Sequence, residues 1–107
     1  MRRRDIILTM ASKIESLLTQ FLEYLEIEKN RSQLTARNYD FYLRRFLAVA
    51  KITEPRQIDL EKVRQFRLYL NRLLIKGKNL KKSTQNYYVI ALRSFLKFLA
   101  KRDIKTM

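Results

Sequence analysis

The chain contains no cysteine and no histidine among its 107 residues. Without cysteine it can form neither a disulfide nor a thiolate metal site. Without histidine it lacks the commonest metal ligand and the commonest general base of enzymes. Its ten acidic residues are scattered along the sequence, so a carboxylate metal site is not indicated either. These absences argue against an enzyme that is complete in itself, and they predict no cofactor and no metal.

Turn-forming residues are also scarce, since Gly77 is the single glycine and Pro55 the single proline. A sheet protein needs frequent tight turns, so this scarcity favours a mostly helical chain. No apolar run approaches the length that spans a bilayer. The opening MRRRDIILTM has the arginines of a signal peptide but too short an apolar stretch. We therefore expect a single cytoplasmic domain of the all-α class.

Four segments carry apolar residues at the three- and four-residue spacing of amphipathic helices. They span 12–29, 33–50, 60–75 and a last stretch that begins at Ser83 or Thr84, either of which could cap it. The predicted N-caps of the first three are Ser12, Ser32 and Asp59. Gly77 is expected to end the third helix in a left-handed conformation. The pattern predicts a compact four-helix bundle, after a basic, flexible segment at 1–11.

The apolar stripes of these helices are predicted to form the core. Leu74 belongs to the stripe of the third helix, and Tyr39, Tyr42 and Tyr88 are also placed inside. Apart from aromatic residues on the outer sides of two helices, the apolar faces look fully used by the core. An interfacial helix would leave one such face free, so binding to a membrane is not expected.

The whole chain has a net charge of +14, and its positive charge is concentrated in the second half. Residues 62–102 contain twelve Lys or Arg and no acid, whereas residues 12–29 hold four Glu against two Lys. Such a single-sign field attracts polyanions and destabilises the compact state through self-repulsion. A solvated helix face would explain any one of these cations. Their number and grouping indicate a polyanionic partner.

The densest group lies where the last helix begins. Lys81, Lys82, Ser83, Thr84 and Asn86 surround helix-start N–H groups that favour a phosphate. Arg93 and Lys97 continue the same side of that helix, and Arg37 and Arg44 lie on the outer side of the helix at 33–50. A basic helix suits the major groove, where cations hold phosphates and Asn or Arg reach base edges. Because no aromatic surface for stacking single-stranded bases is indicated, double-stranded DNA is the predicted partner.

Two stretches resemble the N-terminal core-binding domain, a SAM-like domain, of tyrosine recombinases in the phage-integrase and Xer group. In residues 32–46, Thr35, Tyr39, Leu43 and Phe46 match the family pattern T-x3-Y-x3-L-x2-F. In residues 84–99, TQNYYVIALRSFLKFL resembles its Thr followed eight residues later by Leu-Arg-Ser-Phe. The segment FLEYLEIEKNRS is similar to the family's first helix and the turn after it. The resemblance covers roughly residues 12–104 and implies that the four helices form a compact orthogonal bundle.

The resemblance implies a module that grips one face of a duplex recombination half-site through its second and fourth helices. Together with Lys81 and Ser83 from the charge pattern, the predicted DNA-binding residues are Thr35, Arg37, Asn38, Arg44, Lys82, Thr84, Asn86, Tyr87, Arg93 and Lys97. In the family, a tyrosine nucleophile, arginines and a histidine perform the chemistry in a C-terminal catalytic domain. We expect this chain to be a non-catalytic part of a larger integrase that lacks that domain.

Such a module would act with its catalytic domain and other recombinase protomers on DNA, and would be nucleoid-associated when bound. Two alternatives remain. The chain could be a standalone homologue that never had a catalytic domain. It could also be a basic helical adaptor that binds acidic protein partners or anionic surfaces.

Overall fold

The structure is a computed structural model that describes residues 13–104 and 106. The predicted cap at Ser12 and the predicted flexible segment 1–11 lie outside the described residues. Within them the chain forms α2 (Lys13–Ile27), α3 (Gln33–Val49), the 3-10 turn η1 (Pro55–Gln57), α4 (Leu60–Arg72), strands β1 (Leu74–Ile75) and β2 (Lys78–Asn79), and α5 (Lys82–Lys101). The predicted all-α four-helix bundle is confirmed.

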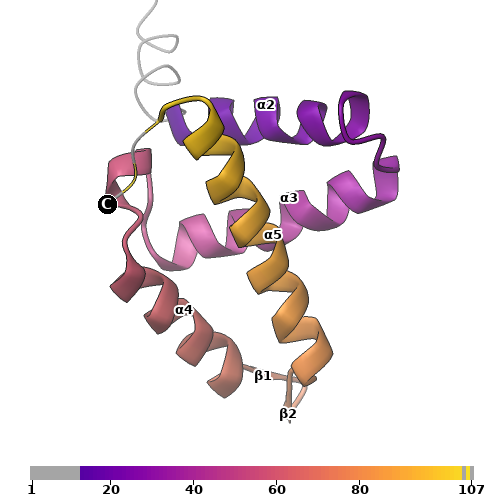
Figure 1. Ribbon diagram of the computed structural model, residues 1–107. Helices are drawn as coiled ribbons and strands as arrows, with labels where there is room; N and C mark the ends of the chain where they lie inside the picture. The colour runs from indigo at the N-terminus through magenta and orange to yellow at the C-terminus, as the bar shows by residue number, and fades with distance from the viewer. Residues whose placement is uncertain (1–12, 105, 107) are drawn as a thin grey trace, which may run out of the picture.

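The helix α5 is the central element of the bundle. Helices α2 and α3 form an antiparallel pair, and α5 crosses both at a steep angle (Figure 1). Helix α4 lies beside the N-terminal half of α5, so α5 contacts each of the other three helices. One face of α5 is therefore committed to the core, and its opposite face remains at the surface.

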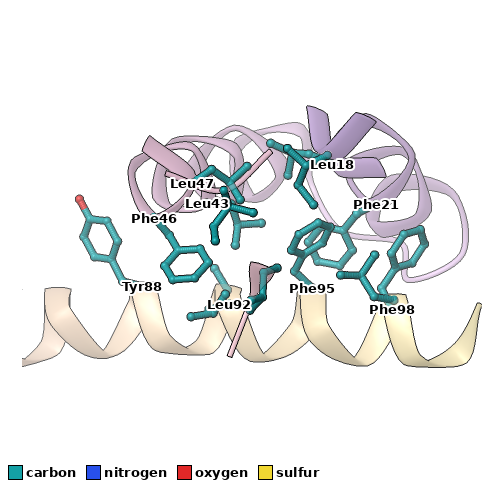
Figure 2. Close-up of a cluster of buried hydrophobic side chains, with 14 of the residues drawn as sticks. Leu18, Phe21, Leu43, Phe46, Leu47, Tyr88, Leu92, Phe95 and Phe98 are labelled. Atoms are coloured by element: carbon teal, nitrogen blue, oxygen red, sulfur yellow. The ribbon is translucent and has the colours of Figure 1, made fainter. Parts of the chain in front are cut away.

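The core is built from large apolar side chains that these helices direct at one another (Figure 2). Phe95 on α5 is fully buried, and its ring centroid lies 5.3 Å from that of Phe21 on α2. Phe46 on α3 meets Phe66 on α4 with centroids 5.1 Å apart. Burying one such side chain stabilises the fold by roughly 1.5–3 kcal/mol. These contacts hold α5 in place and so fix the direction in which its outer face points.

Two of the predicted helix caps are confirmed. The Ser32 hydroxyl accepts a hydrogen bond from the Thr35 backbone N–H at 3.1 Å, at the start of α3. The Asp59 carboxylate accepts one from the Lys62 backbone N–H at 2.7 Å, at the start of α4. Each bond satisfies a donor that has no partner within its own helix.

The predicted end of the third helix is wrong, because α4 stops at Arg72 and not at residue 75. Leu74 and Ile75 pair with Asn79 and Lys78 in a short antiparallel hairpin. Gly77 does have a positive φ of 78°, but it lies in the two-residue turn of this hairpin and does not end a helix. The Asn79 side-chain amide donates to the carbonyls of Asn71 and Leu73, which stabilises the early end.

The predicted cap of the last helix is also wrong. Helix α5 begins at Lys82, and Lys81 is its N-cap, with no side-chain hydrogen bond. The extended backbone of Lys81 allows its carbonyl to accept the first helical bond, from the Gln85 N–H at 3.0 Å. Ser83 and Thr84 consequently lie inside the first turn.

Several burial predictions need correction. Leu74 is 62% exposed, because the hairpin carries it off the α4 stripe. Tyr88 is buried as predicted, whereas Tyr39 and Tyr42 are only half-buried. The apolar faces are also not fully used by the core, since Leu34 and Ile90 remain exposed. Neither position interrupts the packing of α5 against the bundle.

Candidate nucleic-acid interface

The outer face of α5 presents a ridge formed by Asn86, Arg93 and Lys97, which we call the α5 ridge. All three side chains are exposed, as the sequence predicted. At 100° per residue they fall within about 40° of one another around the helix axis. The opposite face of the helix holds Leu92 and Phe95 in the core. The packing that buries one face therefore directs a polar, basic face outward.

A cleft of about 470 Å³ runs between α4 and the N-terminal half of α5, and we call it the α4 cleft. Four of its lining residues are basic and none is acidic: Arg64, Arg67, Lys82 and Arg93. Amide side chains of Asn71, Gln85 and Asn86 complete its polar lining. Lys82 is held at this place, since its Nζ donates to Asn71 Oδ1 at 2.7 Å. The cleft can thus accept an anion between two helices.

Arg64 is fixed at the edge of this cleft by Glu61. Its Nη2 and Nε lie 2.6 and 3.0 Å from the two carboxylate oxygens. Hydrogen bonding to Arg64, with a smaller contribution from Gln65, holds the pKa of the Glu61 carboxyl below its usual range. The same bonds raise the pKa of Arg64, so this guanidinium remains charged. Among the described residues, no ion pair involves Arg67.

The structure divides the predicted residues of α3 into two groups. Arg37 and Asn38 are exposed and form no ion pair with any residue that the structure describes. Arg44 instead bonds to Asp40 at 2.8 Å and lies 3.7 Å from Glu15 on α2. Its charge is balanced on the side of α3 that faces α2. Arg44 is therefore less available to a polyanion than its position in the sequence suggested.

At the helix starts, the predicted residues differ in their access to solvent. Lys81, Lys82, Ser83 and Tyr87 are exposed. Thr84 and Thr35 are half-buried, and the Thr35 hydroxyl lies 3.1 Å from that of Ser32. The start of α5 is thus a more open part of the candidate interface than the start of α3.

Two arginines of this surface, Arg64 and Arg67, and the partly buried Arg45 of α3 were absent from the predicted set. Arg64 and Arg67 belong to the acid-free run from 62 to 102, but the sequence did not show that α4 would lie along α5. Arg45 lies over the Phe41 ring, 5.3 Å from its centroid, and its buried Nη1 has no hydrogen-bond partner among the described residues. The acid-free run could have indicated that the arginines of α4 belong to the basic surface. The position of Arg45 could not be predicted in this way, because it depends on packing.

Other kinds of site receive no support from the described residues. In the part of the chain that the structure describes, no helix combines the length and the apolar character needed to cross a membrane. Within that same part, no group of three or more acidic side chains lies close enough to hold a metal ion.

Comparison with known families decides the assignment. Residues 18–103 match the family described as phage integrase, N-terminal SAM-like domain. The chain belongs to this family. The match includes the described helices from the middle of α2 to the end of α5, and therefore both α3 and α5 of the candidate interface.

Relatives of this SAM-like domain are found among tyrosine recombinases. The chain is 33% identical over 90 residues to the tyrosine recombinase XerC of Bacillus pumilus, covering 84% of this chain and 29% of that protein. It is 31% identical over 91 residues to XerC of Bacillus subtilis, covering 85% of this chain and 29% of that protein. The chain thus spans less than a third of the length of these relatives. No solved structure matches it.

Proposed function

We propose that this SAM-like domain binds duplex DNA at a recombination half-site, with α3 and α5 facing the major groove. The observation that carries the proposal is the α5 ridge. It places Asn86, Arg93 and Lys97 together on the exposed face of a helix whose other face is locked into the core. In the major groove arginine can bond the edge of guanine and asparagine that of adenine, and lysine neutralises phosphates. The ridge combines all three.

The other predicted residues extend this surface on both helices. Arg37 and Asn38 supply exposed polar groups on α3, and Lys81, Lys82, Ser83 and Tyr87 do so at the start of α5. The first-turn N–H groups of α5 also favour a phosphate. Arg44 and the half-buried Thr35 and Thr84 would contribute less. Binding by this domain alone should be weak and only slightly sequence-specific, because a clamp needs a second domain.

We further infer that strand cleavage belongs to another part of the recombinase. The relatives are tyrosine recombinases, and the matched family is their N-terminal domain. The chain has no histidine to assist a tyrosine nucleophile, and Tyr88 is 3% exposed. Incubation with a nicked duplex should yield no adduct that survives denaturing electrophoresis. An adduct lost on changing one tyrosine to Phe would contradict this.

The test of DNA binding is charge reversal on the ridge. The double variant Arg93→Glu with Lys97→Glu should bind a duplex more weakly by roughly 2 kcal/mol at low salt, about 30-fold in Kd. It loses two phosphate contacts and adds repulsion. The fold should survive, because both side chains are exposed. Fluorescence anisotropy of a labelled duplex measures the affinity.

The control is Glu23→Gln with Glu26→Gln on α2, two exposed positions that belong to neither the α5 ridge nor the α4 cleft. It changes net charge in the opposite sense and should alter affinity only slightly. If the control shifts the affinity as much as the ridge reversal does, net charge alone governs binding, and the assignment of α5 to the groove fails. Equal binding to duplex DNA and to an acidic polypeptide would favour the adaptor alternative.

A further inference from the structure

A second basic cleft lies on the other side of α5, and we call it the turn cleft. It has a volume of about 260 Å³ and lies between the α2–α3 turn and the C-terminal half of α5. Its basic lining residues are Lys29 and Arg31 from the turn and Lys97 and Lys101 from α5, and it is lined by no acid. Aromatic side chains form its floor, and Lys29 Nζ lies 5.9 Å from the centroid of the Tyr24 ring.

The two clefts flank the same ridge. Of the residues of α5, Lys82 and Val89 line the α4 cleft, whereas Ser94 and Lys101 line the turn cleft. At 100° per residue, the two pairs point about 120° apart around the helix, with the α5 ridge between them. Figure 1 shows α4 beside the N-terminal half of α5 and the α2–α3 pair crossing its C-terminal half. Cations from two other elements thus converge on opposite flanks of one helix.

We propose that the two clefts hold the phosphates of opposite DNA strands, which rests on the proposed function of α5. The major groove is about 12 Å wide, and a helix with its side chains is about 10–12 Å across. A helix seated in the groove therefore has one sugar-phosphate backbone along each flank. Arg67 on α4 and Lys82 at the start of α5 contact one backbone, and Lys29 and Arg31 on the α2–α3 turn contact the other.

The charge distribution supports this assignment. The segment 23–28, at the C-terminal end of α2, carries three glutamates. The turn that follows nevertheless places Lys29 and Arg31 in a cleft that has no acidic lining residue. Converging like charges destabilise a fold unless an anion lies between them. The turn at the end of α2 belongs to the interface.

The experiment compares two flank variants by duplex titration at several salt concentrations. One is Arg67→Gln with Lys82→Gln, and the other is Lys29→Gln with Arg31→Gln, all at exposed positions. Each should make the slope of log K against log salt less steep by about 2, since each lost phosphate contact removes about 0.9. The two effects should add in the fourfold variant. A thermal unfolding scan checks that every variant folds.

The matched control removes two cations from outside both clefts, as Lys51→Gln with Arg56→Gln, and these residues are also exposed. In this control, the slope of log K against log salt should change by less than half of the change expected for either flank variant. If the flank variants match this control while the ridge reversal still weakens binding, the inference fails and the proposed function stands. If the ridge reversal has no effect either, the proposed function itself fails.

A duplex with uncharged methylphosphonate linkages in one whole strand tests the opposite-strand geometry. The domain can turn around on a non-specific duplex and present either flank to the charged strand. Each flank variant should then bind this duplex within about threefold of the unchanged chain, and the fourfold variant about tenfold more weakly or worse. Full loss of binding in one single-flank variant would show that both strands are not contacted as proposed.

Discussion

Tyr88 joins three helices through its ring. Its centroid lies 4.5 Å from that of Tyr42 on α3 and 5.9 Å from that of Phe66 on α4. Burial raises the pKa of the Tyr88 phenol above its ordinary value, and the neighbouring Arg45 charge opposes this only in part. The phenol is therefore a packing group whose neutral form the folded state favours.

This shift makes stability depend on alkaline pH. Because the folded-state pKa lies above the unfolded one, the stabilisation is fully present below the unfolded pKa and is lost as pH rises through the folded pKa. The variant Tyr88→Phe should lose less stability than the unchanged chain between about pH 9 and pH 11. Urea unfolding at a series of pH values measures this. Tyr87→Phe, at a position 53% exposed, is the matched control; the same flattening in both variants would contradict the assignment of this pH dependence to the buried Tyr88.

The charged residues of the interface show how packing selects among similar side chains. Arg44 and Arg93 are both exposed arginines of amphipathic helices. Arg44 faces α2 and is paired with Asp40 and Glu15, whereas Arg93 faces the α4 cleft among other cations. The same residue type thus has a balanced charge in one place and an unbalanced one in another.

Among the elements, α5 has an unfavourable beginning. Ser32 and Asp59 cap α3 and α4 with side-chain hydrogen bonds, but Lys81 caps α5 with none. A cation at this position also opposes the positive end of the helix dipole. The arrangement destabilises the helix and suits an anion bound at its start. If the proposed function holds, the lysines at the start of α5 serve DNA binding at a cost in helix stability.

Replacing the N-cap residue Lys81 should change the stability of the fold and the affinity for DNA in opposite directions. The variant Lys81→Ser should stabilise the chain by about 1 kcal/mol, since the extended backbone of residue 81 already has the cap conformation. The same variant should bind a duplex more weakly, through loss of a phosphate contact. Urea unfolding and anisotropy titration measure the two effects. Lys101→Ser, in the last turn of α5, should instead destabilise the helix slightly. A loss of stability in Lys81→Ser would refute this account of the cap.

For the whole molecule, the net charge of +14 should give salt two opposite effects. Salt screens self-repulsion in the free domain and also competes for the phosphates of DNA. The unfolding temperature of the free chain should rise between about 50 mM and about 500 mM NaCl. With about five to seven phosphate contacts, log K for a duplex should fall with a slope of about −4 to −6 against log salt.

Both quantities can be measured on one preparation, by thermal unfolding without DNA and by titration with it. A slope near zero would contradict binding through phosphates. An unfolding temperature that falls with salt would contradict the view that unbalanced cations destabilise the free domain.

Much of this fold is already determined by the sequence. Apolar spacing at three and four residues specified the four helices, and the side chains of Ser32 and Asp59 specified where two of them begin. These features depend on groups within one or two turns of each other. The same local periodicity placed Asn86, Arg93 and Lys97 on one exposed face of α5, because burial of the opposite face leaves them no other direction.

Only the tertiary structure decided which helices lie together. The end of α4 depends on Asn79, which reaches back to the carbonyls of Asn71 and Leu73 from the far side of a hairpin. The two basic clefts join residues far apart in the sequence, such as Arg31 with Lys97 and Arg64 with Arg93. Helical periodicity fixes a side chain's direction about its own axis. It carries no information on the neighbour across the packing interface, which depends on how the complete core fits together.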